Sequence, residues 1–447
     1  MSSELGLHLL GKRRFLPLFV TQFLNAFNDN LFKNAMVLFV VYQVLSDEAS
    51  ETWFSALATA LFILPFLTLS ALSGQLADAN DKAKIIRIVK ACEIGIMAVG
   101  AGGLVMGWLD ILVMEAAIPL MLLALLAMGI HSTFFGPIKY AVLPQHLERK
   151  EVLGGTGLVE AGTYLAILAG TIIAGVIAVQ TAAVMCFVVA LIGYFAGRQV
   201  PPAPPEEPGH KIDWNVIRSS ITLVRATMHI PRLFMAIIAI SFFWTVGAVL
   251  FILFPPLVKN VLTSDKEVAS LFLAIFSIGV SIGSIVINRL LKGEVSARYS
   301  APSVIVMGVF IVLFHLVCQN WERTPDGELL QFWDFFYHAD ALPLIGCLLG
   351  IAISGGMFVV PLYAFLTTTV HKSEAARTVA ANNIVNSFAM VIGSIISTGL
   401  SLLEMQTVDQ LLLAAAMCLV SAWLGWKLHK VCDDGKIFAG HSLPDDV

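Results

Sequence analysis

Residues 23–33 read FLNAFNDNLFK, a polar and charged stretch inside an otherwise apolar run from Phe15 to Tyr42. The run is long enough to cross a bilayer, which takes about 20 residues. Asp29 and Lys33 would then lie at membrane depth. A charge there costs roughly 2.5–3.5 kcal/mol on insertion scales, and it is retained mainly where it faces a protein interior or an aqueous cavity. The stretch therefore predicts a membrane helix with a functional polar face.

The composition of the whole chain also predicts a membrane protein. Of its 447 residues, 58% are hydrophobic and only 13% are charged, and the mean hydropathy is +0.84. Soluble domains carry about 25% charged residues. The six cysteines are scattered without metal-ligand spacing, and no catalytic or ATP-hydrolysis motif is visible. We expect no enzyme activity, no cofactor, no metal and no nucleic-acid partner.

Twelve apolar segments are long enough to span a membrane, which predicts an all-α membrane protein. We expect the spans at roughly 15–44, 53–77, 85–107, 117–138, 152–178, 180–197, 232–258, 268–291, 301–318, 341–369, 378–402 and 408–429. Cytoplasmic loops are enriched in Lys and Arg. With both termini in the cytoplasm, only Lys259, Lys266 and Arg323 fall on the opposite side. That topology is our prediction.

The composition changes after Arg198, where five prolines between positions 201 and 208 exclude a membrane helix. We therefore divide the chain into an N-terminal six-helix half (1–197), a cytoplasmic linker (198–231) and a C-terminal six-helix half (232–447). In the linker, apolar residues alternate with Arg218 and Arg225. This pattern suits an interfacial helix on an anionic leaflet, or equally a connector helix packed on the cytoplasmic face.

The two predicted halves repeat in sequence at one constant offset. Tyr140-Ala141, Leu143, Glu160, Ala166, Gly170 and Ile172-Ile173 recur as Tyr363-Ala364, Leu366, Asn383, Ala389, Gly393 and Ile395-Ile396. Duplication explains this order better than chance. Two six-helix halves related by an axis along the membrane normal form a known transporter architecture, with the substrate site between the halves.

The segment after the second span resembles the signature loop of the major facilitator superfamily. It keeps Gly74 and Asp78, followed by the basic residues Lys82, Lys84 and Arg87, but it has Asp81 where a second glycine would stand. The resemblance implies a conformational gating role for Gly74, Asp78, Lys82 and Arg87. A solvated charged loop is the alternative.

Motifs spread over almost the whole chain resemble the bacterial lysophospholipid transporter family. They are Gln22-Phe23-Leu24, Ala26-Phe27, Asp29-Asn30, Pro137-Ile138-Lys139-Tyr140, Gly157-Leu158-Val159-Glu160-Ala161, Phe243-Trp244 and residues 355–362, GGMFVVPL. The resemblance implies a major facilitator fold that flips lysophospholipids, chiefly lysophosphatidylethanolamine, to the cytoplasmic leaflet of a bacterial inner membrane. A separate acyltransferase-synthetase would reacylate them there. Residues 244–255 lack the basic residue that we expect in this family.

A zwitterionic lysolipid presents a phosphate and an ammonium, so its site needs a cation and an anion. Lys33 and Lys139 can supply the cation, and Asp29 and Glu160 the anion. The same residues can instead form structural ion pairs, Asp29 with Lys33 along one helix and Lys139 with Glu160 between helices. The predicted substrate-binding or coupling residues are Asn25, Asn28, Asp29, Asn30, Lys33, Lys139, Tyr140, Glu160, Trp244 and Asn383.

Two other functions stay open at this point. One is a proton-coupled exporter of amphipathic drugs, and the other is a non-transporting membrane scaffold for acylation enzymes. A scaffold has no need of charges such as Asp29 and Lys33 in its interior, which argues against the second. The sequence does not distinguish a proton on Asp29 or Glu160 from a sodium site as the means of coupling.

Overall fold

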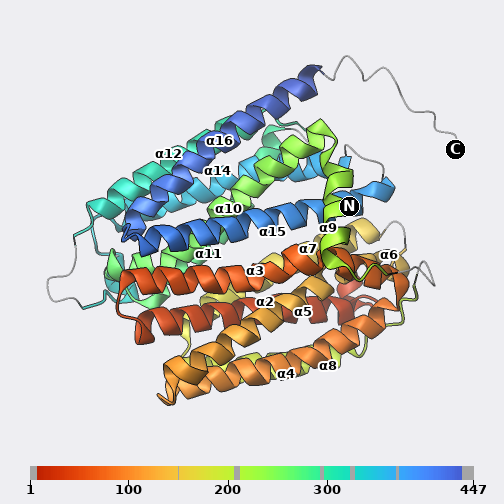
Figure 1. Ribbon diagram of the computed structural model, residues 1–447, viewed down its shortest axis with the longest axis horizontal. Coiled ribbons are helices and arrows are strands. Elements are labelled where there is room, and N and C mark those ends of the chain that lie inside the picture. Colours follow the sequence, from red (N-terminus) through yellow and green to blue (C-terminus); the bar gives the residue numbers. More distant parts are fainter. Residues whose placement is uncertain are drawn as a thin grey trace.

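The computed structural model describes residues 8–148, 151–205, 212–291, 296–322, 328–368 and 372–434. Within these ranges twelve long helices follow one another along the chain (Figure 1). They are α2 (Leu16–Phe39), α3 (Glu48–Ala79), α4 (Lys82–Trp108), α5 (Ile118–Ala141), α7 (Val152–Val176), α8 (Val179–Gly197), α10 (Pro231–Asn260), α11 (Lys266–Leu290), α12 (Ser300–Gln319), α14 (Ala341–Thr368), α15 (Lys372–Leu402) and α16 (Thr407–Asp434). Each corresponds to one predicted span.

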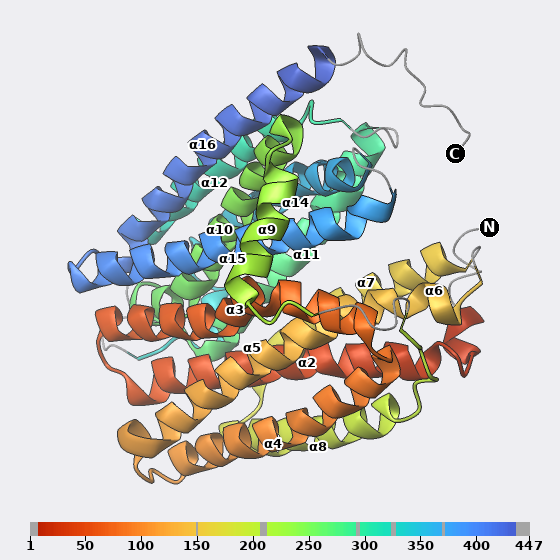
Figure 2. The same cartoon turned by 45° about the vertical axis from the view of Figure 1, so that its right-hand side comes forward.

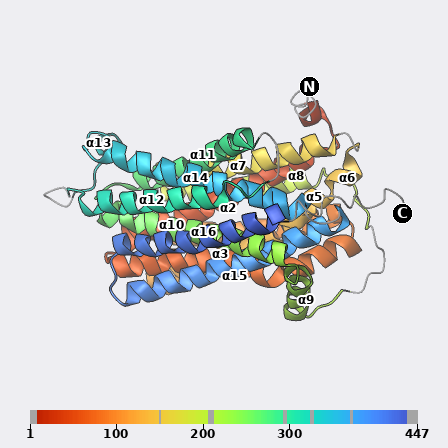
Figure 3. The same ribbon diagram turned by 90° about the horizontal axis from the view of Figure 1, so that it is seen from above.

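Shorter elements connect the long helices. They are η1 (His8–Gly11), the π-helical turns η2 (Val40–Val44) and η3 (Val113–Ala117), and the short helices α6 (Leu143–His146), α9 (Val216–Met228) and α13 (Phe332–Phe335). The helix that we expected in the linker is α9, which packs on α3, α10 and α15. Figure 3 shows α13 at one end of the bundle, with α6 and α9 toward the other.

By length and composition, ten of the described helices are able to cross a membrane. Helix α2 is not among them, because its run of asparagines with Asp29 and Lys33 lowers its mean hydropathy. The described apolar part of α7, Ala161–Val176, is shorter than a full span. The polar stretch from which we predicted the first span is thus also what lowers the hydropathy of α2.

Helix packing repeats between the first and last six long helices. Helix α2 packs on α7 and α8, as α10 packs on α15 and α16. Likewise α3 packs on α5 as α11 does on α14, and α4 packs on α8 as α12 does on α16. The two sets meet through α3 against α15 and α7 against α11. Figure 2 shows them spreading apart toward the end where α6 lies.

Buried apolar side chains form three clusters, one in the last six long helices and two in the first six, of which the smaller runs from Leu9 to Ala203 and includes linker residues. The largest cluster runs from Leu233 to Leu428 and takes in only Leu38 and Ala56 from the first set. A second cluster extends from Phe27 to Ala190. Because most of the apolar burial lies within a set, the contacts between the sets are the part of the structure that can change without unfolding either core.

The loop between α3 and α4 differs from our expectation. Gly74 lies inside α3, which continues to Ala79, so the connection consists only of Asn80 and Asp81. The Asp81 carboxylate caps α4 by accepting hydrogen bonds from the backbone N–H groups of Ala83 (2.8 Å) and Lys84 (3.3 Å). Asp81 is therefore the N-cap residue of α4. The side chain of Asp78 lies outside the described residues.

The proline-containing linker is tied to this short loop. The backbone N–H of Ala203 donates to Asp81 Oδ1 (3.2 Å), and the Ala203 carbonyl accepts from the Lys82 backbone N–H (2.9 Å). Arg87 Nη2 donates to the carbonyl of Val200 (3.1 Å). The Lys82 side chain is fully buried. Predicted gating residues thus hold the linker against the end of the first helix set.

The start of α9 is held by a local exposed pair. Arg218 Nε donates to Asp213 Oδ2 over 3.0 Å, which holds the pKa of the Asp213 carboxyl below its usual range. The backbone N–H of Asp213 donates to Gln75 Oε1 of α3 (2.7 Å). Trp214 and Ile217 expose most of their apolar surface beside this pair. This combination fits an interfacial helix, which remains a prediction.

Candidate functional site

Polar residues of α2 divide between two faces of the helix. Asn25, Asn28 and Asp29 are buried on the face that meets α4 and α5. Asn30 and Lys33 lie on a half-buried stripe with other residues spaced three and four apart. The structure therefore separates residues that the sequence analysis had grouped into one head-group site.

The buried face of α2 enters a network that joins three helices. Asp29 Oδ2 accepts hydrogen bonds from Ser132 Oγ of α5 (2.5 Å) and from Asn25 Nδ2 (3.1 Å). Lys90 Nζ of α4 donates to Asn25 Oδ1 at 3.5 Å. These groups are all at least nine-tenths buried. Such a network stabilises a structure only when its members satisfy one another's charges and hydrogen bonds.

A second part of this network is centred on Glu93 of α4. The carboxylate of Glu93 pairs with Lys90 one turn away and accepts from Asn28 Nδ2 at 3.0 Å. His131 Nε2 of α5 lies 3.4 Å from Glu93 Oε2. Glu93 and His131 belong to different helices, and they come together because α4 packs against α5.

Lys33 does not pair with Asp29 in the described structure. Its ammonium lies over the ring of Phe62 in α3, with Nζ 5.6 Å from the ring centroid. Asn30 bonds to the backbone, donating from Nδ2 to the carbonyl of Ala26 (2.8 Å). The intrahelical ion pair that we offered as an alternative is therefore not formed. Lys33 is half-buried, with its ammonium directed toward α3.

Lys139 near the end of α5 belongs to a second polar group. Its Nζ lies 3.2 Å from Thr163 Oγ1 of α7, and Thr163 Oγ1 donates to Gln22 Oε1 of α2 over 2.8 Å. The Lys139 ammonium also lies 5.0 Å from the ring centroid of Tyr140. The side chain of Glu160, the expected partner, lies outside the described residues. Lys139 thus connects the three helices α2, α5 and α7.

Trp244 of α10 lies in the corresponding group of the last six helices. Trp244 Nε1 donates to the hydroxyl of Tyr363 in α14 over 2.7 Å. Asn386 of α15 also donates to that hydroxyl (3.4 Å) and accepts from Ser241 Oγ of α10 (2.7 Å). The predicted residue Asn383 is exposed instead. The sequence analysis missed Asn386, which lies one turn after Asn383 and on the buried face of α15.

One end of the bundle, which we call the Glu51 end, is closed by contacts between the two helix sets. Glu51 of α3 is fully buried. Its Oε1 accepts from Lys259 Nζ of α10 over 2.5 Å, and its Oε2 accepts from Asn260. Lys259 Nζ also donates to the carbonyls of Val41 (2.5 Å) and Leu45 (2.8 Å). All three ammonium donors therefore have acceptors on the other helix set.

The π-helical turn η2 explains why carbonyls are available to Lys259. The backbone N–H of Leu45 reaches back to the Val40 carbonyl, and the helix ends there. Carbonyls in the last turn of a helix lack intrahelical partners. In this structure the side chain of Lys259 binds two of them. The sequence had placed Lys259 only as a charge in an outer loop.

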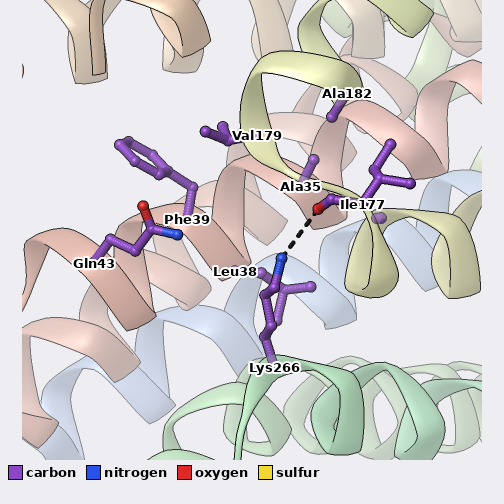
Figure 4. A pocket seen from close by; sticks show the side chains of 9 residues that line it. Ala35, Leu38, Phe39, Gln43, Ile177, Val179, Ala182 and Lys266 are labelled. Atoms are coloured by element: carbon purple, nitrogen blue, oxygen red, sulfur yellow. Dashed lines mark hydrogen bonds between the residues drawn. The ribbon is translucent and has the colours of Figure 1, made fainter. Parts of the chain in front are cut away.

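Further contacts hold the Glu51 end together. Lys266 Nζ at the start of α11 donates to the carbonyl of Ile177 (3.0 Å) and closes a small hollow between α2, α7 and α8 (Figure 4). Thr407 of α16 donates through its backbone N–H to Glu48 Oε1 (2.7 Å). Several hydrogen bonds between described residues of the two helix sets gather at this end.

The family model for the Major Facilitator Superfamily matches residues 18–394. The chain belongs to the major facilitator superfamily. The expected fold class, an all-α multi-span membrane protein of the major facilitator fold, is therefore confirmed, and the chain is a transporter rather than an enzyme. The match begins in α2 and ends in α15, so it includes the groups around Asp29, Lys139, Trp244 and Glu51.

Among curated proteins, this major facilitator chain is similar to lysophospholipid transporters. LplT of Escherichia coli O157:H7 is 25% identical over 383 residues, which cover 83% of this chain and 85% of the relative. LplT of Shigella sonnei is 24% identical over the same length and coverage. At 24–25% identity the similarity is distant.

Among solved structures, other major facilitator transporters share the fold. A D-xylose-proton symporter aligns with a TM-score of 0.66 at 13% identity, covering 93% of this chain and 97% of that chain. A bacterial homologue of the human lysosomal transporter Spinster, in an inward-facing conformation, aligns with a TM-score of 0.66 at 10% identity, covering 94% and 97%. At these identities the likeness concerns the fold alone.

Proposed function

We propose that this transporter moves lysophospholipids, chiefly lysophosphatidylethanolamine, to the cytoplasmic leaflet of a bacterial inner membrane. The observation that carries the proposal is the similarity to LplT over 83% of the chain. A separate acyltransferase-synthetase then reacylates the lipid. The proposed orientation places the linker and both termini in the cytoplasm, and the Glu51 end outside.

The charges of the described structure are compatible with this cargo. A lysophospholipid carries a phosphate. The ammonium of a lysine is a compact point charge that can pair with this phosphate. Lys33 and Lys139 both lie on half-buried surfaces of the first helix set. A half-buried position is less hydrated than bulk water, so an ion pair formed there is stronger than one formed at an open surface. We propose that these two lysines attract the head group.

The contacts at the Glu51 end suggest how access changes during transport. We propose that residues 1–197 and 232–447 move as two bodies and that Glu51 and Lys259 close the outer side. Opening that side would break the ion pair, and lipid binding would offset the lost contacts. A ligand shifts such an equilibrium only by its difference in affinity between the two states. We also propose that Asp78, Lys82 and Arg87 contribute to gating on the opposite side.

The proposed cargo is tested by the number of acyl chains that the transporter accepts. Uptake into cells with and without the protein is compared for glycerophosphoethanolamine, lysophosphatidylethanolamine and phosphatidylethanolamine. We expect the one-chain lipid to be preferred. Removing the chain forfeits about 0.8 kcal/mol for each buried methylene, and a second chain overpacks the interior. Equal uptake of glycerophosphoethanolamine would indicate a carrier of soluble metabolites and contradict the proposal.

A further inference from the structure

The Lys139 and Trp244 groups occupy equivalent places in the two helix sets. Tyr140 and Tyr363 are separated by the offset of the internal repeat. Thr163 and Asn386 are separated by the same offset. In the first set, Thr163 of α7 bonds to Lys139 of α5 and to α2. In the second set, Asn386 of α15 bonds to Tyr363 of α14 and to α10. The same three-helix junction is therefore built twice.

The chemistry of the two junctions differs. The first junction holds a cation, Lys139, beside Tyr140. The second holds a pair of aromatic side chains, Trp244 and Tyr363, joined by a hydrogen bond. Residues 244–255 contain no Lys, Arg or His. The junction in the first helix set is thus cationic, and the equivalent junction in the second helix set is aromatic.

Trp244 is exposed in a helix that is otherwise covered. From Met235 to Asn260 it is the only exposed residue of α10, with 38% of its surface accessible. Helices α3, α11, α14, α15 and α16 all pack around α10. Its indole N–H is bound to Tyr363 in the plane of the ring, and this bond does not cover the ring faces. The indole also makes a T-shaped contact with the ring of Phe243, so it is held in one orientation with part of its surface accessible.

We propose that Trp244 and Tyr363 bind the ammonium of a zwitterionic phospholipid head group while Lys139 binds its phosphate. This assignment rests on the proposed function. Aromatic faces attract cations, most strongly in tryptophan, and such pairs are the usual means of recognising alkylated ammonium groups. A head group with an anion and a cation would then be oriented between the two helix sets. Because residues 244–255 contain no basic residue, this segment adds no cation that would repel the ammonium.

The test compares two lipids that differ in the ammonium. Lysophosphatidylethanolamine and lysophosphatidylglycerol have the same phosphate and the same single chain, and only the first carries an ammonium. Binding to the purified protein is measured by calorimetry, and uptake is measured in parallel. We expect Trp244→Leu to weaken binding of the ethanolamine lipid about fivefold to thirtyfold, and binding of the glycerol lipid less than twofold.

Three further variants complete the comparison. Trp244→Phe keeps an aromatic face and should retain most of the affinity for the ethanolamine lipid. Lys139→Gln should weaken both lipids alike, because both carry the phosphate. Trp108→Leu removes a similarly exposed tryptophan at the end of α4 and should change neither.

Distinct outcomes separate this inference from the proposed function. Equal weakening of both lipids by Trp244→Leu, or no weakening of either, would overturn the ammonium site even if transport is observed. Binding of both lipids by the wild-type protein without uptake would contradict the proposed transport, and the binding comparison would still decide the ammonium site. No binding of either lipid would overturn both.

Discussion

Asp29 and Lys33 lie one helical turn apart in α2, but their charged groups face different neighbours. Asp29 accepts a 2.5 Å hydrogen bond from Ser132 of α5, whereas Lys33 lies 5.6 Å from the ring centroid of Phe62 in α3. The acid therefore belongs to the internal network of the first helix set, and the base belongs to a half-buried surface. Substitutions at the two positions should have different effects on transport.

We predict that Lys33→Gln raises the half-saturation concentration for lysophosphatidylethanolamine about tenfold, because it removes one charge-assisted contact to the phosphate. Asp29→Asn should instead lower the maximal rate at least tenfold with little change in half-saturation, because it removes a charge that faces the Lys90 network. Uptake measured over a range of lipid concentrations separates the two. An Asp29 variant with an altered half-saturation and a normal maximal rate would place Asp29 at the substrate.

The fully buried pair of Lys90 and Glu93 gives a prediction about stability. Removing one partner of a buried ion pair typically costs about 3–5 kcal/mol, because it leaves the other charge unpaired. We expect Lys90→Met to lower the thermal midpoint strongly and Lys90→Met/Glu93→Leu to recover most of the loss. The measurement is thermal unfolding of the purified protein in detergent. If the single and double variants were equally destabilised, the pair would contribute by packing alone.

The ion pair of Glu51 and Lys259 predicts a shift in conformation. Glu51→Gln removes the charge facing Lys259, so we expect the closed Glu51 end to open at least ten times more often. A cysteine replacing the buried Thr52, in a protein without other cysteines, reports this opening by its rate of reaction with a membrane-impermeant thiol reagent. Asp47→Asn is the matched control, because Asp47 is exposed and bonds to its own helix. An unchanged labelling rate in Glu51→Gln would show that apolar contacts alone keep this end closed.

The cap of α4 gives a fourth prediction. Asp81 accepts from two N–H groups of α4 and from Ala203 of the linker. Asp81→Ala should therefore cost about 1–2 kcal/mol of stability and slow turnover, because the linker loses its attachment. Asp81→Asn keeps an acceptor and should restore most of both. Denaturation and uptake rates of the two variants provide the check, and identical losses would mean that the charge rather than the cap matters.

The twelve spans could be predicted from the sequence because each is a long apolar segment bounded by charges, Pro or Gly. Their ends were less predictable. Helix α3 extends to Ala79 through the expected loop, because nothing in residues 74–79 stops a helix until Asp81 can cap the next one. The loop motif was recognised, but the sequence pattern did not show that α3 continues through it to Ala79.

The candidate site was only partly predictable, because it depends on which helix faces meet. The polar residues of α2 were identified, but their division into two faces follows from packing against α4 and α5. Ser132 and His131 gave no signal as single polar residues in an apolar span. Asn386 was overlooked although it stands at the repeat offset from Thr163. The pairing of Glu51 with Lys259 joins residues from different helix sets, and no local pattern predicts it.

The central claim is that this major facilitator protein translocates lysophospholipid, and reconstitution of the purified protein into liposomes tests it most directly. Labelled lysophosphatidylethanolamine is added to the outer leaflet, and albumin then extracts the lipid that remains outside. The account predicts that liposomes with the protein protect the lipid from extraction faster than empty liposomes do, and that Asp29→Asn reduces this difference in rate at least tenfold. Equal protection in liposomes with and without the wild-type protein would contradict the account.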